Sequence, residues 1–257
     1  MKKKIIVIIG VASFSALAVA GFIFLNNSMK IKEYKSMLVS LPEGFTYTAH
    51  TGCSGTEENS IEAIDAAINS GADIIEIDLH FDKDGEPVLS HDAPKGGEIT
   101  LDEAFGKING IKRLRINIDV KSTAAIEKVK PLAEKYGLLD RIFFTGVHDE
   151  FLDDVRSKGG GIRYYLNVDV ESERKQTAEY LESLVRKVKD SGAIGINFNK
   201  NNATKELVDT FRENGLLVSI WTVDGEADMY RILSYAPDNI TTRNPDKLSE
   251  ALKLITQ

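Results

Sequence analysis

The stretch IIEIDL at residues 74–79 decides the fold, because apolar and acidic side chains alternate along it. Successive side chains of a β-strand point to opposite faces of the sheet. Ile75, Ile77 and Leu79 therefore form an apolar face that packs against helices, while Glu76 and Asp78 share the other face. Such a strand predicts a sheet covered by helices, with two carboxylates near the carboxyl ends of its strands.

The stretch INIDVK at residues 116–121 repeats this alternation, with Asp119 and Lys121 on the polar face. If the two strands are parallel neighbours, Asp119 completes a group of three carboxylates with Glu76 and Asp78. Buried like charges oppose each other unless a cation neutralises them. Because oxygen ligands suit hard cations, the sequence predicts a Mg²⁺ or Ca²⁺ site, with Lys121 placed to hold an anionic oxygen.

Working outward, short β-rich runs alternate with helical stretches, which is typical of parallel strands joined by crossover helices. Expected strands span residues 45–50, 74–79, 87–91, 114–120, 141–146, 163–168, 193–198, 216–223 and 239–242. Expected helices span residues 60–70, 123–136, 150–158, 173–190, 204–214, 226–235 and 245–255. With residues 87–91 set aside as a hairpin partner, eight strands fit an α/β fold of the (β/α)8 TIM-barrel type. A doubly wound open sheet is the alternative, weakened by the lack of G-x-G-x-x-G after the first strand.

Two histidines, His50 and His91, end β-type segments, and two imidazoles at a barrel mouth can act as general acid and general base. Trp221 lies at the end of the seventh barrel strand, where it can form a wall for the substrate. His148 follows the fourth barrel strand and is interpreted as a surface residue.

In chain order, a series of motifs resembles those of the glycerophosphodiester phosphodiesterase family. These are HTG at 50–52, ENS at 58–60, GADIIEID at 71–78, DGEPVLSHD at 84–92, NIDVK at 117–121, WTV at 221–223 and ITTRNP at 240–245. Several linked motifs in order are more specific than any one of them. The resemblance covers about residues 45–255.

This resemblance implies a role for each of six residues: metal binding by Glu76, Asp78 and Asp119, acid–base catalysis by His50 and His91, and phosphate contact by Lys121. It also implies that a substrate hydroxyl next to the phosphate attacks the phosphorus, and that the cyclic intermediate is then hydrolysed. The expected products are glycerol 3-phosphate and an alcohol.

The sequence departs from the family pattern at three points. Thr51 replaces an arginine, and threonine lacks the planar guanidinium that grips phosphate with two hydrogen bonds. Arg163 is a candidate substitute, although a surface ion pair is the favoured interpretation. Asp119 is one methylene shorter than the usual glutamate. Only a short loop is expected between His91 and Leu114, which predicts an open site.

The N-terminus predicts a membrane anchor. Residues 1–4 are a basic cytoplasmic end, and residues 5–25 contain no charged residue, the length of one transmembrane helix. Residues 26–44 form a connector with one or two helical turns, and residues 45–257 form the barrel domain outside the cytoplasm. The alternative is a signal peptide cleaved after the AVA at residues 18–20, which would release a secreted enzyme.

The formal net charge is −7, or −10 without the three lysines at residues 2–4, which excludes nucleic acid as a partner because phosphate backbones need a basic face. The expected partner is a small phosphodiester or a lipid head group. Two other functions stay open: a phospholipase acting on intact lipid, and a non-catalytic barrel that binds polyol phosphates.

Overall fold

The computed structural model describes residues 25–255. The expected anchor therefore lies outside the described residues, apart from Leu25. Within residues 25–255, each helix is too short or too polar to cross a bilayer.

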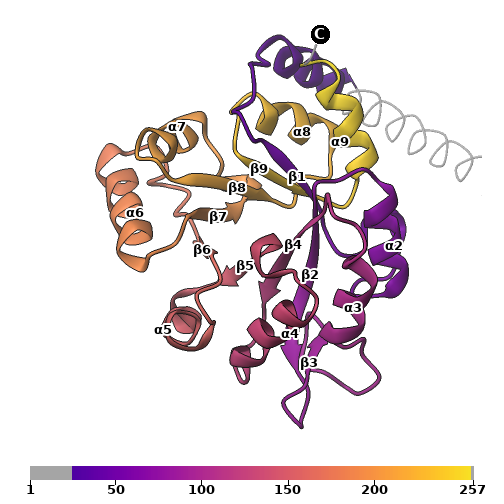
Figure 1. The fold of residues 1–257 in the computed structure, drawn as a ribbon. Coiled ribbons are helices and arrows are strands. Elements are labelled where there is room, and N and C mark those ends of the chain that lie inside the picture. The colour runs from indigo at the N-terminus through magenta and orange to yellow at the C-terminus, as the bar shows by residue number, and fades with distance from the viewer. Residues whose placement is uncertain (1–24, 256–257) are drawn as a thin grey trace, which may run out of the picture.

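Eight parallel strands of the described chain close into a barrel, as the sequence predicts (Figure 1). They are β1 (Thr46–Ala49), β2 (Ile74–Phe81), β4 (Arg115–Val120), β5 (Ile142–Val147), β6 (Tyr164–Asn167), β7 (Gly195–Asn199), β8 (Leu217–Trp221) and β9 (Asn239–Thr242). Pairing of β1 with both β9 and β2 closes the ring. The short β3 (Pro87–Leu89) is antiparallel to β2, which confirms it as a hairpin partner.

Helices surround the strands on the outside of the barrel. They are α2 (Ile61–Asn69), α3 (Leu101–Ile108), α4 (Val129–Lys135), α5 (Asp149–Lys158), α6 (Ala178–Ser191), α7 (Lys205–Glu213), α8 (Glu226–Leu233) and α9 (Pro245–Leu252). Short 3₁₀ turns are η1 (Cys53–Gly55), η2 (Ile126–Lys128), η3 (Leu139–Arg141) and η4 (Lys200–Asn202). The apolar faces of strands and helices meet in one large core between the sheet and the helical ring.

The expectation of a short loop between His91 and Leu114 is wrong, because that stretch contains the helix α3. Thr100 begins this helix with a reciprocal capping box, in which its side chain accepts from the Glu103 N–H and Glu103 accepts from the Thr100 N–H. Leu101 and Phe105 are fully buried. The helix packs against β3, α2 and α4 on the outside of the barrel, so it is a crossover helix and does not cover the site.

The connector is more regular than the sequence predicts, since residues 25–36 form about three helical turns instead of one or two. Figure 1 shows this segment beside α8 and α9. Ile31, Tyr34, Leu38 and Leu41 pack against the core, and the Lys35 ammonium lies 4.5 Å from the Tyr230 ring centroid on α8.

The barrel interior is lined by small polar side chains in addition to the carboxylates. The buried polar residues of the strands are Thr48, Glu76, Asp78, Asn117, Thr145, Asn167, Asn197, Ser219, Asn239, Thr241 and Thr242. Several of them hydrogen-bond to one another across neighbouring strands, as Thr145 does with Asn117 and Asn197 with Asn167. Such a lining leaves a polar hollow at the mouth of the barrel.

Candidate active site

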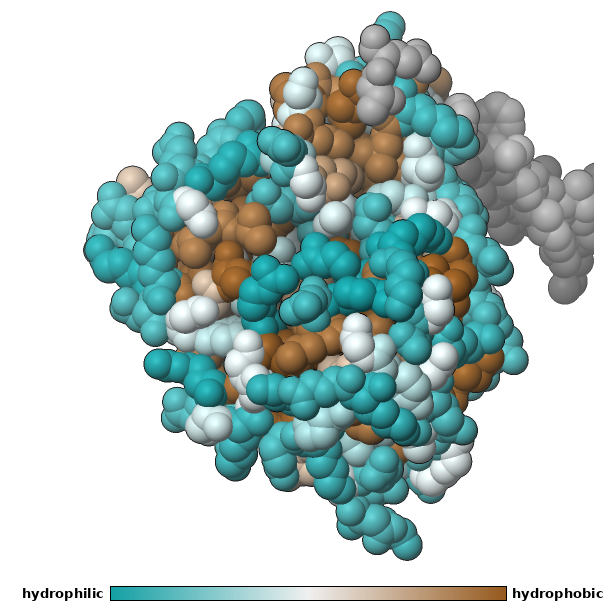
Figure 2. All heavy atoms as spheres, viewed as in Figure 1, coloured by the Kyte–Doolittle hydropathy of each residue, from teal (hydrophilic) through white to brown (hydrophobic). Residues whose placement is uncertain are grey.

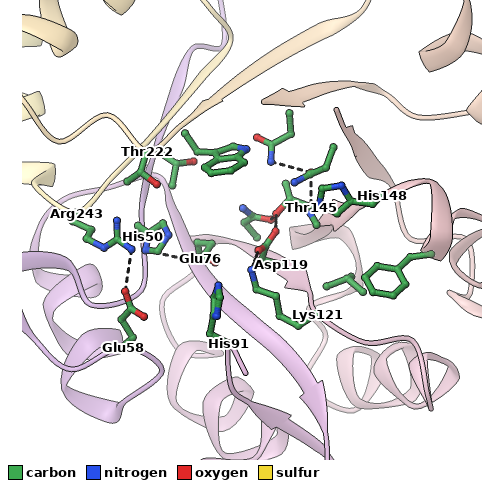
Figure 3. Close-up of a pocket in the computed structure, with 18 residues that line it drawn as sticks. His50, Glu58, Glu76, His91, Asp119, Lys121, Thr145, His148, Thr222 and Arg243 are labelled. Carbon is green, nitrogen blue, oxygen red and sulfur yellow. Dashed lines mark hydrogen bonds and ion pairs between the residues drawn. The ribbon is translucent and has the colours of Figure 1, made fainter. Parts of the chain in front are cut away.

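A cavity of about 630 Å³ opens at the carboxyl ends of the barrel strands. Six of the seven residues singled out from the sequence line it: His50, Glu76, His91, Asp119, Lys121 and Trp221. The seventh, Asp78, lies behind the wall with 2 % of its surface exposed. Figure 3 shows His50, Glu76, His91, Asp119 and Lys121 converging from β2, from the ends of β1 and β4 and from the loop after β3.

The three carboxylates come together because β2 and β4 pair in parallel with Asp78 opposite Asp119. One oxygen from each of Glu76, Asp78 and Asp119 lies within 4.8 Å of the others. The shorter side chain of Asp119 thus still reaches the group. Three carboxylates in this arrangement fit a hard divalent cation.

Glu76 is the most constrained of the three. It is 4 % exposed, and its Oε2 accepts a 2.8 Å hydrogen bond from the Thr51 N–H. Burial, and then the charges of Asp78 and Asp119, raise its pKa well above the usual value. A bound cation would reverse this effect, so the electrostatics of the site favour cation binding.

Asp78 is held by Asn59, which precedes α2. The Asn59 amide donates to Asp78 Oδ2 at 2.8 Å, and its carbonyl oxygen accepts from the Asp78 N–H at 3.1 Å. Thr51 in turn accepts a 2.6 Å hydrogen bond from the Asn59 N–H. Thr51 is 3 % exposed and connects Glu76 to Asn59, so it organises the carboxylates from behind.

Lys121 bridges two carboxylates, with its Nζ 2.5 Å from Asp119 Oδ2 and 3.2 Å from Asp78 Oδ1. Burial lowers the pKa of Lys121, but the neighbouring carboxylates outweigh burial and raise it above its usual value.

Thr145 lies within hydrogen-bonding distance of Asp119 Oδ1, at 2.7 Å. Gly146 must be glycine here, because it has φ 70° and an added Cβ would lie 2.8 Å from Asp119 Oδ1.

The two histidines differ in burial. His50 is 18 % exposed, with Nδ1 2.7 Å from the Thr51 carbonyl oxygen and 3.7 Å from Glu76 Oε2. Burial lowers the pKa of His50, and the charge of Arg243 lowers it further against the opposing Thr51 hydrogen bond. His91 is 60 % exposed, and its Nδ1 lies 3.0 Å from Asp92 Oδ1. Figure 3 shows His50 and His91 flanking Glu76.

The expectation for His148 is wrong, whereas Arg163 lies at the surface, as the favoured interpretation expects. His148 is not on the outer surface but lines the cavity, because it directly follows β5 as His50 follows β1. The position of His148 directly after a predicted strand was the feature of the sequence that could have placed it at the cavity. Arg163 is exposed just before β6, at the amino end of the strand, and it does not line the cavity. It is therefore not a substitute for the arginine missing at position 51.

Sequence reasoning gave no role at the cavity to Arg243 and Phe151, which line it together with Glu58. Arg243 follows β9 and pairs with Glu58, which is 185 residues away in the chain. A contact over such a separation has no local sequence signal. Trp221 forms part of the wall as predicted, and its buried Nε1 has no hydrogen-bond partner within the described chain.

A closed (β/α)8 barrel with acidic and basic side chains gathered at its C-terminal mouth has the arrangement of a barrel enzyme. Three carboxylates, a lysine and two histidines at one barrel mouth are the groups that metal-assisted hydrolysis of a phosphodiester would use.

Comparison with known proteins identifies the family. The sequence matches the glycerophosphoryl diester phosphodiesterase family over residues 45–124 and 111–247, and the chain belongs to this family. The family match and the curated relatives confirm the expected enzyme class, glycerophosphodiester phosphodiesterase.

Two relatives carry the name glycerophosphodiester phosphodiesterase. One, from Caldanaerobacter subterraneus, is 27 % identical over 237 residues, covering 78 % of this chain and 94 % of the relative. The other, from Bacillus subtilis, is 23 % identical over 265 residues, covering 82 % of this chain and 88 % of the relative.

Solved structures share the fold. A glycerophosphoryl diester phosphodiesterase assigned in Silicibacter pomeroyi superposes with a TM-score of 0.69 at 18 % identity, covering 81 % of this chain and 93 % of that one. A phosphodiesterase of Oleispira antarctica, solved in complex with the product sn-glycerol-3-phosphate, gives 0.64 at 18 % identity and covers 83 % and 97 %.

Proposed function

We propose that this protein hydrolyses glycerophosphodiesters to glycerol 3-phosphate and an alcohol. The observation that carries the proposal is the convergence of three carboxylates and two histidines on one cavity in a member of this family. The product complex of the Oleispira antarctica protein supports the same class of product.

Glu76, Asp78 and Asp119 are proposed to hold one divalent cation, Mg²⁺ or Ca²⁺, because all their donor atoms are carboxylate oxygens. When bound, such a cation polarises the phosphoryl oxygens of the substrate. Asn59 and Thr51 keep the carboxylates in position through their hydrogen bonds to Asp78 and Glu76.

His50 and His91 are proposed as the general base and general acid pair. If His50 carries its proton on Nδ1, it donates to the Thr51 carbonyl oxygen and leaves Nε2 free to accept a proton. The substrate hydroxyl next to the phosphate would lose its proton to one imidazole, while the other protonates the leaving alcohol. The same pair, with roles exchanged, would then activate water against the cyclic phosphate.

Lys121 and Trp221 are proposed to bind the substrate. Lys121 is half-buried on the cavity wall, where its ammonium can contact a phosphate oxygen while it stays paired with Asp119. Trp221 offers an apolar surface to the glycerol or the leaving group.

A substrate screen tests this function. Purified protein would be incubated with glycerophosphocholine, glycerophosphoglycerol or intact phospholipid vesicles, with Mg²⁺, Ca²⁺ or chelator, beside His91→Ala. We expect metal-dependent release of glycerol 3-phosphate from a soluble diester, reduced at least about 100-fold in His91→Ala. Cleavage of phospholipid in vesicles, with no release of glycerol 3-phosphate from a soluble diester, would support a phospholipase instead. No turnover of any diester, with binding retained, would support a non-catalytic barrel.

We further propose that residues 5–25 anchor the protein in the cell membrane, with the barrel outside the cytoplasm. Two observations support this. Four of the six large apolar side chains that are exposed in the described chain lie in the adjoining segment, namely Leu25, Met29, Met37 and Val39. Figure 2 shows hydrophobic residues gathered over the region of α8, α9 and this segment.

Membrane fractionation and protease accessibility test the anchor. We expect the full chain in the membrane fraction, extracted by detergent and not by high salt, with the barrel cleaved by protease added outside the cells. A shortened chain found free outside the cells would support cleavage after residues 18–20. Protection of the barrel in intact cells would contradict the proposed orientation.

A further inference from the structure

The cavity must attract a phosphodiester anion, yet its floor is acidic. Three carboxylates, one lysine and one divalent cation sum to a formal charge of zero. Lys121 is also committed to Asp119 and Asp78, at 2.5 Å and 3.2 Å. Among the described residues that line the cavity, one other lysine or arginine is present, namely Arg243.

Arg243 enters the cavity beside His50 because their strands are neighbours. β1 and β9 pair in parallel with Ala49 opposite Thr242, so the residues that follow each strand emerge side by side. The His50 N–H donates to the Thr242 carbonyl oxygen at 2.9 Å, and the Ser54 N–H donates to the Arg243 carbonyl oxygen at 2.9 Å. Figure 3 shows the Arg243 guanidinium next to the His50 ring.

Two carboxylates hold the guanidinium in place without using all its donors. Nη2 lies 3.0 Å from Glu58 Oε1, and Nη1 lies 3.5 Å from Asp224 Oδ2. The Asp224 carboxylate also accepts the Arg243 N–H at 2.7 Å. A guanidinium has five N–H donors in a rigid fork, and the side chain is 39 % exposed, so other donors remain available to a ligand.

The loop after β1 cannot supply this contact. Thr51 is buried and occupied by Asn59 and Glu76, and Arg163 is outside the cavity. Arg243 directly follows the adjacent strand β9, within the ITTRNP motif at residues 240–245.

We propose that Arg243 is the phosphate-binding guanidinium of this enzyme, donating to a non-bridging phosphate oxygen beside His50, in the place that an arginine at position 51 would serve. This inference rests on the proposed function, because it assumes a phosphate-bearing ligand in the cavity.

Direct binding tests it separately from turnover. Dissociation constants for inorganic phosphate and glycerol 3-phosphate would be measured by calorimetry on the wild type, Arg243→Met and Arg243→Lys, with the metal present. A matched control is Arg174→Met, since Arg174 is also about half exposed and paired with a glutamate, but lies outside the cavity. Melting temperatures would establish that each variant is folded.

We expect Arg243→Met to bind both ligands about 10- to 100-fold more weakly, the loss typical of hydrogen bonds from a charged donor. Arg243→Lys should recover part of this loss, because it keeps the charge without the fork, and Arg174→Met should bind as the wild type does. On a diester that the wild type cleaves, Arg243→Met should lower kcat/KM, with partial rescue by added guanidinium.

Folded Arg243→Met that binds phosphate within about 2-fold of the wild type would overturn the inference, as would a wild type that binds neither ligand. A wild type that binds both ligands through Arg243 but cleaves no diester would sink the proposed function and leave the phosphate contact standing.

Discussion

At the scale of single residues, Glu76 brings stability and function into conflict. Its carboxylate is 4 % exposed and lies within 4.8 Å of two others. Burial and like charges both oppose its ionised form, whereas a bound cation needs that form. The metal-free protein is therefore destabilised by the arrangement that would bind the metal.

Glu76→Gln is expected to raise the melting temperature of the metal-free protein near neutral pH, because it removes a buried negative charge but keeps an acceptor for the Thr51 N–H. The shift should be about 2–4 °C for each kcal/mol of relief. The wild type should gain about 2.7 kcal/mol at a metal concentration 100 times its dissociation constant. Glu76→Gln should lose most of that gain.

Calorimetric melts with chelator, Mg²⁺ and Ca²⁺ check both effects. Glu182→Gln is a suitable control, because Glu182 is an exposed carboxylate on α6, away from the three carboxylates. A metal-dependent rise that is equally large in Glu76→Gln would contradict Glu76 as a ligand.

At the scale of elements, α3 shows where patterns in the sequence were overlooked. Thr100 and Glu103 stand three residues apart before Ala104 and Phe105, which is the spacing of a capping box. The helix has buried residues at 101, 104, 105 and 108, a helical period. The capping box and the helical period were therefore present in the sequence, but the helix is so short that the stretch was interpreted as a loop.

Thr100→Ala is expected to lower the free energy of unfolding by about 0.5–2 kcal/mol, because it removes the acceptor for the Glu103 N–H. Thr100→Ser keeps the hydroxyl and should be close to the wild type. Urea unfolding measures the difference. Activity should be unchanged, since α3 packs outside the barrel. A loss of activity without a loss of stability would show that α3 acts on the site.

At the scale of the whole molecule, the segment before the barrel is part of the domain. Ile31 and Tyr34 pack against the core, while Lys35 reaches Glu226 and Tyr230 on α8. If residues 5–25 are anchored, this docking would fix the orientation of the barrel to the membrane instead of leaving it on a flexible tether.

Ile31→Ala, made in a chain that begins at residue 25, is expected to lower the melting temperature. The loss should be about 1–2 kcal/mol, below the 2–5 kcal/mol of a fully buried site, because Ile31 is half-buried. Met29→Ala on the same helix is the control, since Met29 is 65 % exposed. Equal melting temperatures for the two variants would contradict docking of this segment.

The sequence by itself determined the barrel and its carboxylates. Alternation in IIEIDL and INIDVK fixes which side chains face the interior, and parallel pairing of these strands brings Asp119 to Asp78. These are local properties, because the period of a strand and the caps of a helix are written within a few residues.

Only the tertiary structure decided which residues surround the three carboxylates. Closure of the ring by β1 and β9 sets Arg243 beside His50 and Glu58, and the turn after β5 brings His148 to the cavity. The tertiary structure also shows that Thr51 is a buried link between Glu76 and Asn59 instead of a ligand contact. Such contacts depend on strand register and on which loops meet across the mouth, and no short stretch of sequence encodes a neighbour 185 residues away.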